Sequence, residues 1–337
     1  METVLIDGWL DGLDASRLID EASVSEARRL TREVAMAAGL PKERAERVVI
    51  AASELARNAL IHGRHGQFAV TPISRDGVSG VEIVCVDAGP GIPDPTRALA
   101  GLPRSTGSLG VGVASARANT DEIDFDIRLG EGTCVRARSF ATSVPRRREI
   151  GVFGRPHAEE ARSGDYASWH RTNDGLLLAL CDGLGHGPAA RSSSLVGMET
   201  VQANRDQAPI AILEACHRAM ARTRGGVMAV VKVREPSSID VAAVGNVTLE
   251  LVRPRTARRF PSTSFVVGAA QRGWRAHVES GSLGTDEAIV LFSDGLPSRV
   301  SLGNELELLR EPPIVIAHQL VQRFGRDTDD VLVVVAR

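Results

Sequence analysis

The spacing of apolar residues along the chain changes near residue 140. Before that point, apolar residues recur at helical intervals over long stretches and alternate with polar residues over shorter ones. Gly39 and Pro41 separate two of the helical stretches, as expected for a helix end followed by a new start. The pattern predicts helices at 23–39, 42–62 and 113–120, and strands at 4–6, 67–74, 81–86, 122–128 and 133–139.

The second half is dominated by short apolar runs that are typical of buried strands. Strands are predicted at 150–153, 166–171, 176–181, 227–233, 239–244, 248–252, 288–292 and 331–336, and helices at 188–203, 209–222 and 313–324. Between the halves, residues 141–148 lack apolar periodicity and contain a proline and three arginines, which is typical of a linker. We therefore predict an α+β protein with domains at 1–140 and 149–337, joined by a linker at 141–148.

Composition excludes several classes of protein. A chain of 337 residues exceeds the size at which one hydrophobic core keeps growing, which fits two domains. The net charge of −2 and an aromatic content of 4% give no footprint for nucleic acid. The chain shows no signal-peptide pattern, no apolar run long enough to span a membrane, and no paired cysteines. We expect a cytoplasmic protein without nucleic-acid or membrane partners, zinc or disulfides.

Polar residues form a stripe on the 42–62 helix. Glu54 and Asn58 are one turn apart, and His62 follows one turn later. The strand at 81–86 then ends in Asp87-Ala-Gly-Pro-Gly91, whose glycines allow a ligand to approach the backbone closely. Taken singly, these features are also typical of a solvated helix face and a turn.

Two further glycine motifs follow in the first half. Gly107 to Gly112 opens a helix, where backbone N–H groups and the helix dipole favour an anion. Gly132-Thr133 lies on the last predicted hairpin, where a hydroxyl could reach a base edge. The cluster is neither a Walker A motif nor a dinucleotide fingerprint, because the spacing and the following residues differ.

The order of these motifs resembles the ATPase fold shared by histidine kinases, the heat-shock-90 chaperone and bacterial anti-sigma kinases. It is most similar to the last group, serine kinases that phosphorylate STAS-domain antagonist proteins in partner-switching systems. The resemblance covers roughly residues 20–140. It implies Mg-ATP binding, with Glu54 as general base and Asn58 as Mg²⁺ ligand. The other implied nucleotide contacts are Asp87 at the adenine amino group, Gly89 and Gly91 along the nucleotide, Gly110 and Gly112 at the phosphates, and Thr133 at the base.

Carboxylates stand at the ends of apolar runs throughout the second half. They are Asp165, Asp182, Asp294 and Asp329. A single Asp-Gly is typical of a turn, but several buried strands tipped by acid would crowd charges that repel one another. Hard cations resolve such repulsion, and all-oxygen ligands favour Mg²⁺ or Mn²⁺ over Zn²⁺. Two ions about 3.5–4 Å apart would activate water and hold phosphoryl oxygens for in-line attack.

This half resembles the SpoIIE-like branch of the metal-dependent (protein phosphatase 2C type) serine/threonine phosphatases, and the resemblance implies a four-layer α-β-β-α fold. The motifs are Ser-Gly-Asp165, Cys-Asp182-Gly-Leu-Gly-His-Gly187, Gly245-Asn246, Phe-Ser-Asp294-Gly-Leu and Asp329-Asp-Val-Leu-Val-Val-Val335. The resemblance implies that Asp182 bridges two metal ions, that the Gly183 carbonyl binds one of them, and that Asp165, Asp294 and Asp329 complete the set. Whether Asp329 or Asp330 is the ligand stays open, and His186 is interpreted as a loop residue with no metal role.

The favoured hypothesis is a bifunctional regulator of a partner-switching pathway. Its first domain would phosphorylate serine or threonine on a STAS-type antagonist, and its second would remove such phosphate. One alternative keeps the phosphatase and makes the ATP domain a sensor or docking module. The other is a binding protein of the anti-sigma type that sequesters a sigma factor or another switch protein.

Overall fold

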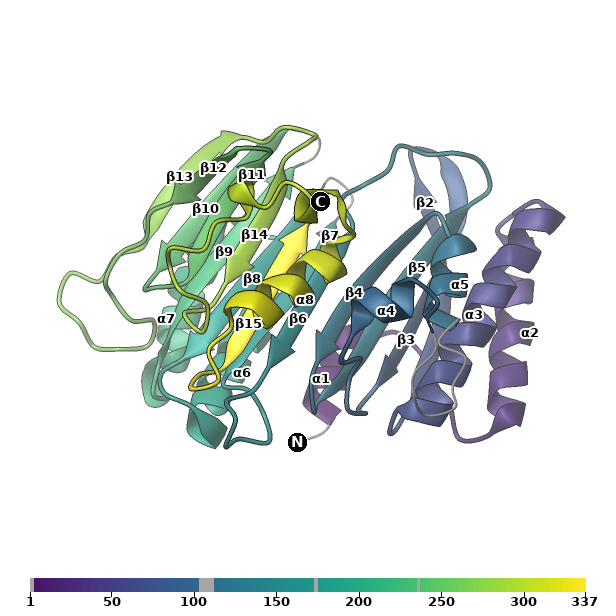
Figure 1. The fold of residues 1–337 in the computed structure, drawn as a ribbon, viewed down its shortest axis with the longest axis horizontal. Helices are drawn as coiled ribbons and strands as arrows, with labels where there is room; N and C mark the ends of the chain where they lie inside the picture. The colour runs from purple at the N-terminus through teal and green to yellow at the C-terminus, as the bar shows by residue number, and fades with distance from the viewer. Residues whose placement is uncertain (1–2, 103–111, 173–174, 235–236) are drawn as a thin grey trace. The chain divides into compact units, whose positions relative to one another are not determined.

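The computed structural model describes residues 3–102, 112–172, 175–234 and 237–337. The chain divides into two compact units, Met1–Gly151 and Val152–Arg337, each of which mixes helices with β-sheet (Figure 1). The predicted α+β class is therefore confirmed. The boundary between the units falls just beyond the segment predicted as a linker.

The first unit places helices on a mainly antiparallel sheet with strand order β1–β2–β3–β5–β4. Helices α2 and α3 pack against each other and against β2 and β3, while α1 contacts β3 (Figure 1). The elements are α1 (Thr3–Leu10), β1 (Ser16–Arg17), α2 (Glu21–Ala37), α3 (Lys42–His62), β2 (Gln67–Arg75), β3 (Val78–Asp87), α4 (Pro95–Leu99), α5 (Gly112–Ala118), β4 (Glu122–Arg128) and β5 (Gly132–Phe140).

The sequence accounts for the two long helices of this unit. A capping box starts α2, because the Asp20 side chain accepts from the Ser23 backbone N–H (2.8 Å) while the Ser23 hydroxyl accepts from the Asp20 N–H. Small residues make up most of the buried stripe of α3, including Ala52 and Ala56, which lets this helix lie close to the sheet. The polar stripe of α3 stays at least partly exposed.

The predicted strand at 4–6 is wrong, because these residues belong to helix α1. Leu5, Ile6, Trp9 and Leu10 are all buried, and their i, i+1, i+4, i+5 spacing is that of a helix face. The indole Nε1 of Trp9 donates to Asp126 Oδ2 at 3.0 Å. A run of three apolar residues is too short to distinguish a strand from a helix, and the contact that fixes α1 comes from far along the chain.

Strand β4 carries three acidic side chains that are buried rather than solvated. Glu122, Asp124 and Asp126 alternate with Ile123, Phe125 and Ile127, and every residue of the strand is buried. Each carboxylate is matched by an arginine: Arg75 with Glu122 (2.5 and 2.8 Å), Arg138 with Asp124 (2.6 Å) and Arg128 with Asp126 (2.5 Å). Buried ionic groups of this kind are tolerated because their charges are compensated and hydrogen-bonded.

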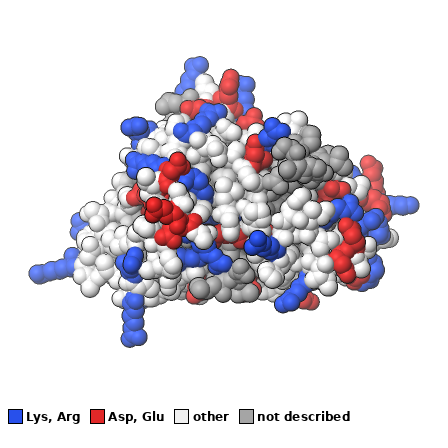
Figure 2. All heavy atoms as spheres, turned by 60° about the horizontal axis from the view of Figure 1, so that its bottom comes forward, with Lys and Arg blue, Asp and Glu red and all other residues white. Residues whose placement is uncertain are grey.

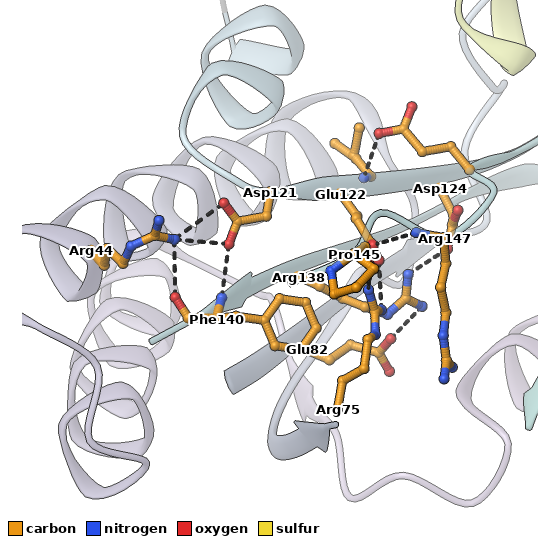
Figure 3. A network of polar contacts seen from close by, with 12 residues as sticks. Arg44, Arg75, Glu82, Asp121, Glu122, Asp124, Arg138, Phe140, Pro145 and Arg147 are labelled. Carbon is orange, nitrogen blue, oxygen red and sulfur yellow. Dashed lines mark hydrogen bonds and ion pairs between the residues drawn. The ribbon is translucent and has the colours of Figure 1, made fainter. Parts of the chain in front are cut away.

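The same network holds the segment predicted as a linker (Figure 3). Glu122 Oε1 accepts from the Arg147 backbone N–H at 3.0 Å, and Asp124 Oδ1 accepts from the Ile150 N–H at 2.8 Å. Arg75 also donates to the Pro145 carbonyl at 3.2 Å. Residues 145–150 are thus tied to the sheet of the first unit, which their composition did not indicate.

In the second unit two sheets lie between layers of helices. Helices α6 and α7 contact the sheet β13–β10–β9–β8–β7, α8 contacts β15 of the sheet β6–β15–β14–β11–β12, and β7 touches β15 across the two sheets. This is the predicted α-β-β-α arrangement. The elements are β6 (Ile150–Arg155), β7 (Asp165–Thr172), β8 (Gly175–Gly183), α6 (Gly187–Ala203), α7 (Pro209–Ala219), η1 (Met220–Arg222), β9 (Gly226–Arg234), β10 (Ser238–Val244), β11 (Thr248–Arg253), β12 (Thr256–Phe260), β13 (His277–Ser282), β14 (Ala288–Phe292), η2 (Leu302–Asn304), η3 (Leu308–Arg310), α8 (Pro313–Phe324) and β15 (Val331–Ala336).

Strands β12 and β13 were not predicted, because both are edge strands. Residues 256–259 are exposed, and β13 shows only intermediate and exposed positions. An edge strand needs no continuous apolar run, and charged residues on it discourage pairing with other chains.

The composition predicts a chain without disulfides, membrane spans or a basic surface for nucleic acid. All four cysteines are buried free thiols. No helix in the described ranges is long and apolar enough to cross a membrane. Basic and acidic side chains are interspersed on the face drawn in Figure 2, without a continuous basic area.

Replacing Glu122 by alanine should destabilise the first unit by about 3–5 kcal/mol, because Arg75 would keep a buried charge without its partner. Peptide-resolved hydrogen exchange on the full chain measures this, and protection of the Arg147 amide should fall with it. As a control, Glu46→Ala removes the exposed pair with Arg32 and should cost below about 1 kcal/mol. Equal effects of the two substitutions would contradict the structural role assigned to the buried network.

Candidate functional site

Two carboxylates of the second unit face each other across a strand pair. Asp165 begins β7, and Asp182 lies near the end of β8, directly opposite it in the antiparallel register. Side chains at opposite positions lie on the same face of the sheet, where two like charges destabilise the pairing. The Asp165–Asp182 pair therefore does not stabilise the pairing of β7 with β8 by itself.

The other two acids come from the ends of strands in the facing sheet. Asp294 follows β14 and Asp329 precedes β15, and these strands are paired. Ser293 fixes the junction, because its N–H donates to the Leu332 carbonyl (3.1 Å) and its Oγ accepts from the Leu332 N–H (3.0 Å). Gly295 is required here, since a Cβ would lie 2.1 Å from the Asp330 carbonyl oxygen.

The acids influence one another's ionisation. Burial, followed by repulsion from Asp165, Asp294 and Asp329, raises the pKa of Asp182 to about 10, and Asp182 shares a side-chain hydrogen bond with Asp294. Burial also raises the pKa of Asp165 well above its usual range, with Asp330, Asp294 and Asp329 adding to the rise. The pKa of Asp329 is raised by burial and by Asp294. Asp182 and Asp294, distant in sequence, are therefore neighbours in space, as the two-metal hypothesis requires.

Asp330 and Asn246 hold these acids in place. Asp330 is buried, and its two oxygens accept from the N–H groups of His157 and Gly164, each at 2.8 Å. This fixes the turn that leads into Asp165. Asn246 donates to Asp294 Oδ2 at 2.6 Å and so positions this carboxylate. The Gly245-Asn246 motif was noted in the sequence, but Asn246 was given no role there.

The donor set suits a hard divalent cation. All of its side chains are carboxylates, and Asp165 Oδ2 is buried without a hydrogen-bond partner. In the described part of the chain, no three or more His, Cys, Asp or Glu side chains are gathered tightly enough to hold a metal ion as they stand. Asp182 and Asp294 share a side-chain hydrogen bond, and one of the two can donate it only in its protonated form.

His186 lies on the loop that follows Asp182. Its Nδ1 is 2.9 Å from Glu160 Oε1, and its ring stacks on that of His157 with centroids 4.8 Å apart. The hydrogen bond to Glu160 raises the pKa of His186. The side chain therefore has a carboxylate partner in the segment between β6 and β7.

In the first unit, one helix face meets the start of another helix. A Cβ at Gly112, the first residue of α5, would lie 2.8 Å from Asn58 Nδ2 and 3.0 Å from Glu54 Oε2. Glu54, Asn58 and Gly112 are thus brought into contact, and a side chain at 112 would collide with the polar pair. Gly110 lies outside the described residues.

The Asp87 loop is clamped between the end of α3 and the β4–β5 hairpin. Asp87 Oδ1 accepts from the Gly89 N–H at 2.8 Å, and Asp87 pairs with Thr133 in register. Gly91 has φ +77° and a Cβ there would lie 3.0 Å from the Arg128 carbonyl oxygen. Burial raises the pKa of Asp87 to about 6. Gly63, which the sequence analysis did not single out, also has no room, since its Cβ would lie 2.5 Å from that of Asp87.

Comparison with known proteins assigns the first unit. Residues 19–139 match the histidine kinase-like ATPase domain. The chain is 33% identical over 121 residues to the serine/threonine-protein kinase RsbT of Bacillus subtilis (strain 168), covering 36% of this chain and 91% of that protein. The chain belongs to the histidine kinase-like ATPase family. In this ATPase unit, Glu54, Asn58, Asp87 and Thr133 all lie within the matched residues.

The second unit has phosphatase relatives. Residues 172–337 match the Stage II sporulation protein E family. The chain is 27% identical over 124 residues to the phosphoserine phosphatase RsbX of Bacillus subtilis (strain 168), covering 36% of this chain and 61% of that protein. The solved structure of RsbX with magnesium has the same fold, with a TM-score of 0.51, 20% identity, and coverage of 58% of this chain and 96% of RsbX.

A second solved structure shares the fold of this unit. It comes from work on the bacterial stressosome as a modular system adapted to control secondary messenger signalling. It has a TM-score of 0.52 and 26% identity, and covers 57% of this chain and all 100% of its own. The second unit therefore shares its fold with RsbX, and we call it the phosphatase unit after this relative.

Mn²⁺ or Mg²⁺ should raise the melting temperature of the phosphatase unit, and by more at about pH 8 than at about pH 6. A carboxyl pKa raised from 3.8 to about 10 makes the cation-free unit less stable as pH rises between those values, because ionisation is disfavoured only in the folded state. A cation must displace the retained protons, so its affinity rises with pH. Differential scanning calorimetry with and without the ion measures both effects.

The control for this experiment is Asp182→Asn, which should lose most of the cation-induced shift and flatten its pH dependence. In the unsubstituted protein, the cation could instead raise the melting temperature equally at both pH values. That result would contradict the claim that the carboxyls with raised pKa values form the cation site.

Proposed function

We propose that the protein is a bifunctional regulator of a partner-switching system, a protein kinase and a protein phosphatase on one chain. The observation that carries the phosphatase half is the group formed by Asp165, Asp182 and Asp294, in which opposed strands bring uncompensated carboxylates together. The kinase half is supported by the ATPase family match and by the contact of Glu54 and Asn58 with the start of α5. The phosphatase activity is the better supported of the two.

In the phosphatase unit, we propose Asp165, Asp182, Asp294 and Asp329 with the Gly183 carbonyl as ligands of two Mg²⁺ or Mn²⁺ ions. Asp329 is preferred over Asp330 because both oxygens of Asp330 already accept backbone hydrogen bonds. Divalent ions bound there would supply an activated water and neutralise charge on the phosphoryl oxygens. Asn246 would keep Asp294 oriented through its 2.6 Å hydrogen bond.

In the ATPase unit, Asn58 would hold the Mg²⁺ of Mg-ATP, and Glu54, one turn away, would accept the proton of a substrate hydroxyl. Asp87 would accept a hydrogen bond from the adenine amino group, with Thr133 opposite it on β5. Gly89, Gly91, Gly110 and Gly112 would leave the backbone open to the nucleotide. This assignment gives the ATPase unit a phosphoryl donor and a base for the acceptor.

We propose a serine or threonine of a STAS-type antagonist protein as the common substrate class. Support comes from relatives of the two units, the serine/threonine-protein kinase RsbT and the phosphoserine phosphatase RsbX, which belong to the same organism and share the name Rsb. The two opposed activities would then set the phosphorylation level of one switch protein. The alternative of a sensor domain attached to a phosphatase keeps the second unit unchanged and removes only phosphate transfer by the first.

Incubation of the full chain with Mg-ATP and a STAS-domain antagonist tests both activities at once. Asp182→Ala should accumulate phosphoprotein, because hydrolysis is lost while transfer continues. Glu54→Ala should lower transfer by about 10²–10⁴-fold, the usual contribution of a positioned base, and leave hydrolysis of added phosphoprotein intact. Mass spectrometry of the antagonist measures its phosphorylation over time.

Three outcomes would contradict parts of the proposal. Absence of phosphoprotein with Asp182→Ala, while that variant still binds ATP, would favour the sensor alternative. Unchanged hydrolysis by Asp182→Ala would remove the phosphatase assignment, and loss of regulation only on disrupting a binding surface would favour a sequestering protein of the anti-sigma type.

Asp87→Asn should weaken ATP binding by about tenfold or more without lowering the stability of the nucleotide-free protein. The charge of Asp87 is disfavoured by burial, so an amide that keeps the acceptor for Gly89 relieves that cost while presenting a weaker acceptor to adenine. Calorimetric titration with ATP and thermal melting measure the two effects. Glu43→Gln, at the exposed start of α3, is the control and should change neither.

A further inference from the structure

A short turn of the phosphatase unit lies beside the loop that follows Asp182. The turn joins η1 to β9, and Gly226 at the start of β9 pairs with Gly183 in the antiparallel register. One residue further along the loop, the Leu184 N–H donates to the Gly225 carbonyl at 3.1 Å. The turn and the loop that carries the proposed ligands are therefore held together by backbone hydrogen bonds.

Arg224 projects from this turn toward the loop. Its Nη1 lies 3.4 Å from the position that a Cβ on Gly185 would occupy. The side chain is exposed, and within the described residues it has no hydrogen bond or ion pair. Its guanidinium N–H groups are therefore available to a ligand that arrives from solvent.

The backbone that presents Arg224 is fixed on both sides. Thr223 Oγ1 donates to the Met220 carbonyl (2.8 Å) and accepts from the Gly225 N–H (3.0 Å). Gly226 exchanges two hydrogen bonds with Val267, at 3.0 and 2.8 Å. Gly225 has φ +80°, and a Cβ there would lie 2.6 Å from the Val267 carbonyl oxygen, so the turn tolerates no other residue at this point.

A positive charge at Arg224 would offset the repulsion between the acidic residues and a phosphate ester. Carboxylates repel a phosphate ester, and the proposed metal ions would be largely neutralised by their own ligands. An arginine presents paired N–H donors in a plane that matches two phosphoryl oxygens, and a fixed backbone reduces the entropy lost on binding. Arg222, two residues earlier, is also exposed, but among the described residues no contact places it against the loop.

We propose that Arg224 binds the phosphoryl group of the phosphoserine or phosphothreonine substrate at the edge of the Asp165–Asp182–Asp294 cluster. The inference rests on the proposed phosphatase function and adds a substrate-binding residue to it. Arg224 contacts the phosphoryl oxygens that do not face the metal ions, so it acts on substrate and product phosphate alike. Its removal weakens binding of any phosphate monoester, whatever the rest of the substrate is.

The test compares Arg224→Gln and Arg224→Lys with the control Arg222→Gln in the full-length protein with Mn²⁺. Kinetic constants are measured for a phosphoserine peptide and for p-nitrophenyl phosphate, together with inhibition by inorganic phosphate. Arg224→Gln should raise KM for both substrates and the phosphate Ki by about tenfold or more, with the lysine variant between it and the unsubstituted protein. Arg222→Gln should stay within about twofold, and calorimetry should find Mn²⁺ affinity unchanged in all three.

The outcomes separate this proposal from the proposed function. An unchanged phosphate Ki in Arg224→Gln would overturn it, and so would a rise in KM for the peptide alone, which would place Arg224 on the flanking chain. If the unsubstituted protein hydrolyses neither substrate, the phosphatase assignment fails. Calorimetric binding of inorganic phosphate to the Mn²⁺-loaded protein then decides the role of Arg224, because the glutamine variant should lose that binding and an equal affinity in both proteins would refute it.

Discussion

Repulsion between carboxylates that the fold itself brings together governs the phosphatase unit. Asp165 and Asp182 occupy opposite positions of one strand pair, and Asp294 and Asp329 reach them from strand ends in the other sheet. Backbone pairing fixes these positions, so the acids cannot move apart without breaking the sheets. The energy cost appears as raised carboxyl pKa values at Asp165, Asp182 and Asp329. The divalent cations that we propose at this site would offset this cost.

The ATPase unit also contains buried carboxylates, but there each negative charge is compensated by an arginine of the chain. On β4, Glu122, Asp124 and Asp126 each have an arginine within hydrogen-bond distance, and some of the same oxygens hold the backbone at 147 and 150. Compensation by the chain's own cations makes these residues structural. The two units therefore differ in the partner of the buried acid. It is an arginine in the ATPase unit and, in our proposal, a metal ion in the phosphatase unit.

The two kinds of unit are relatives of separate proteins in Bacillus subtilis, a kinase and a phosphatase. Their union in one chain fixes their stoichiometry at one to one. The segment between them is bound to the ATPase sheet through Pro145, Arg147 and Ile150, and so it has few of the freedoms of a flexible linker.

Motif order and apolar periodicity by themselves determined both families, nearly all the long helices and buried strands, and the candidate acids, because these features are local or repeat at fixed intervals. They failed at residues 4–6, where burial of Trp9 against Asp126 selects a helix, and at the edge strands β12 and β13, which lack apolar runs. Only the tertiary structure decided that Asp330 is occupied by backbone donors and that Arg224 lies beside Gly185. Such contacts join residues far apart in sequence, and their distances depend on strand register and packing, which no local pattern encodes.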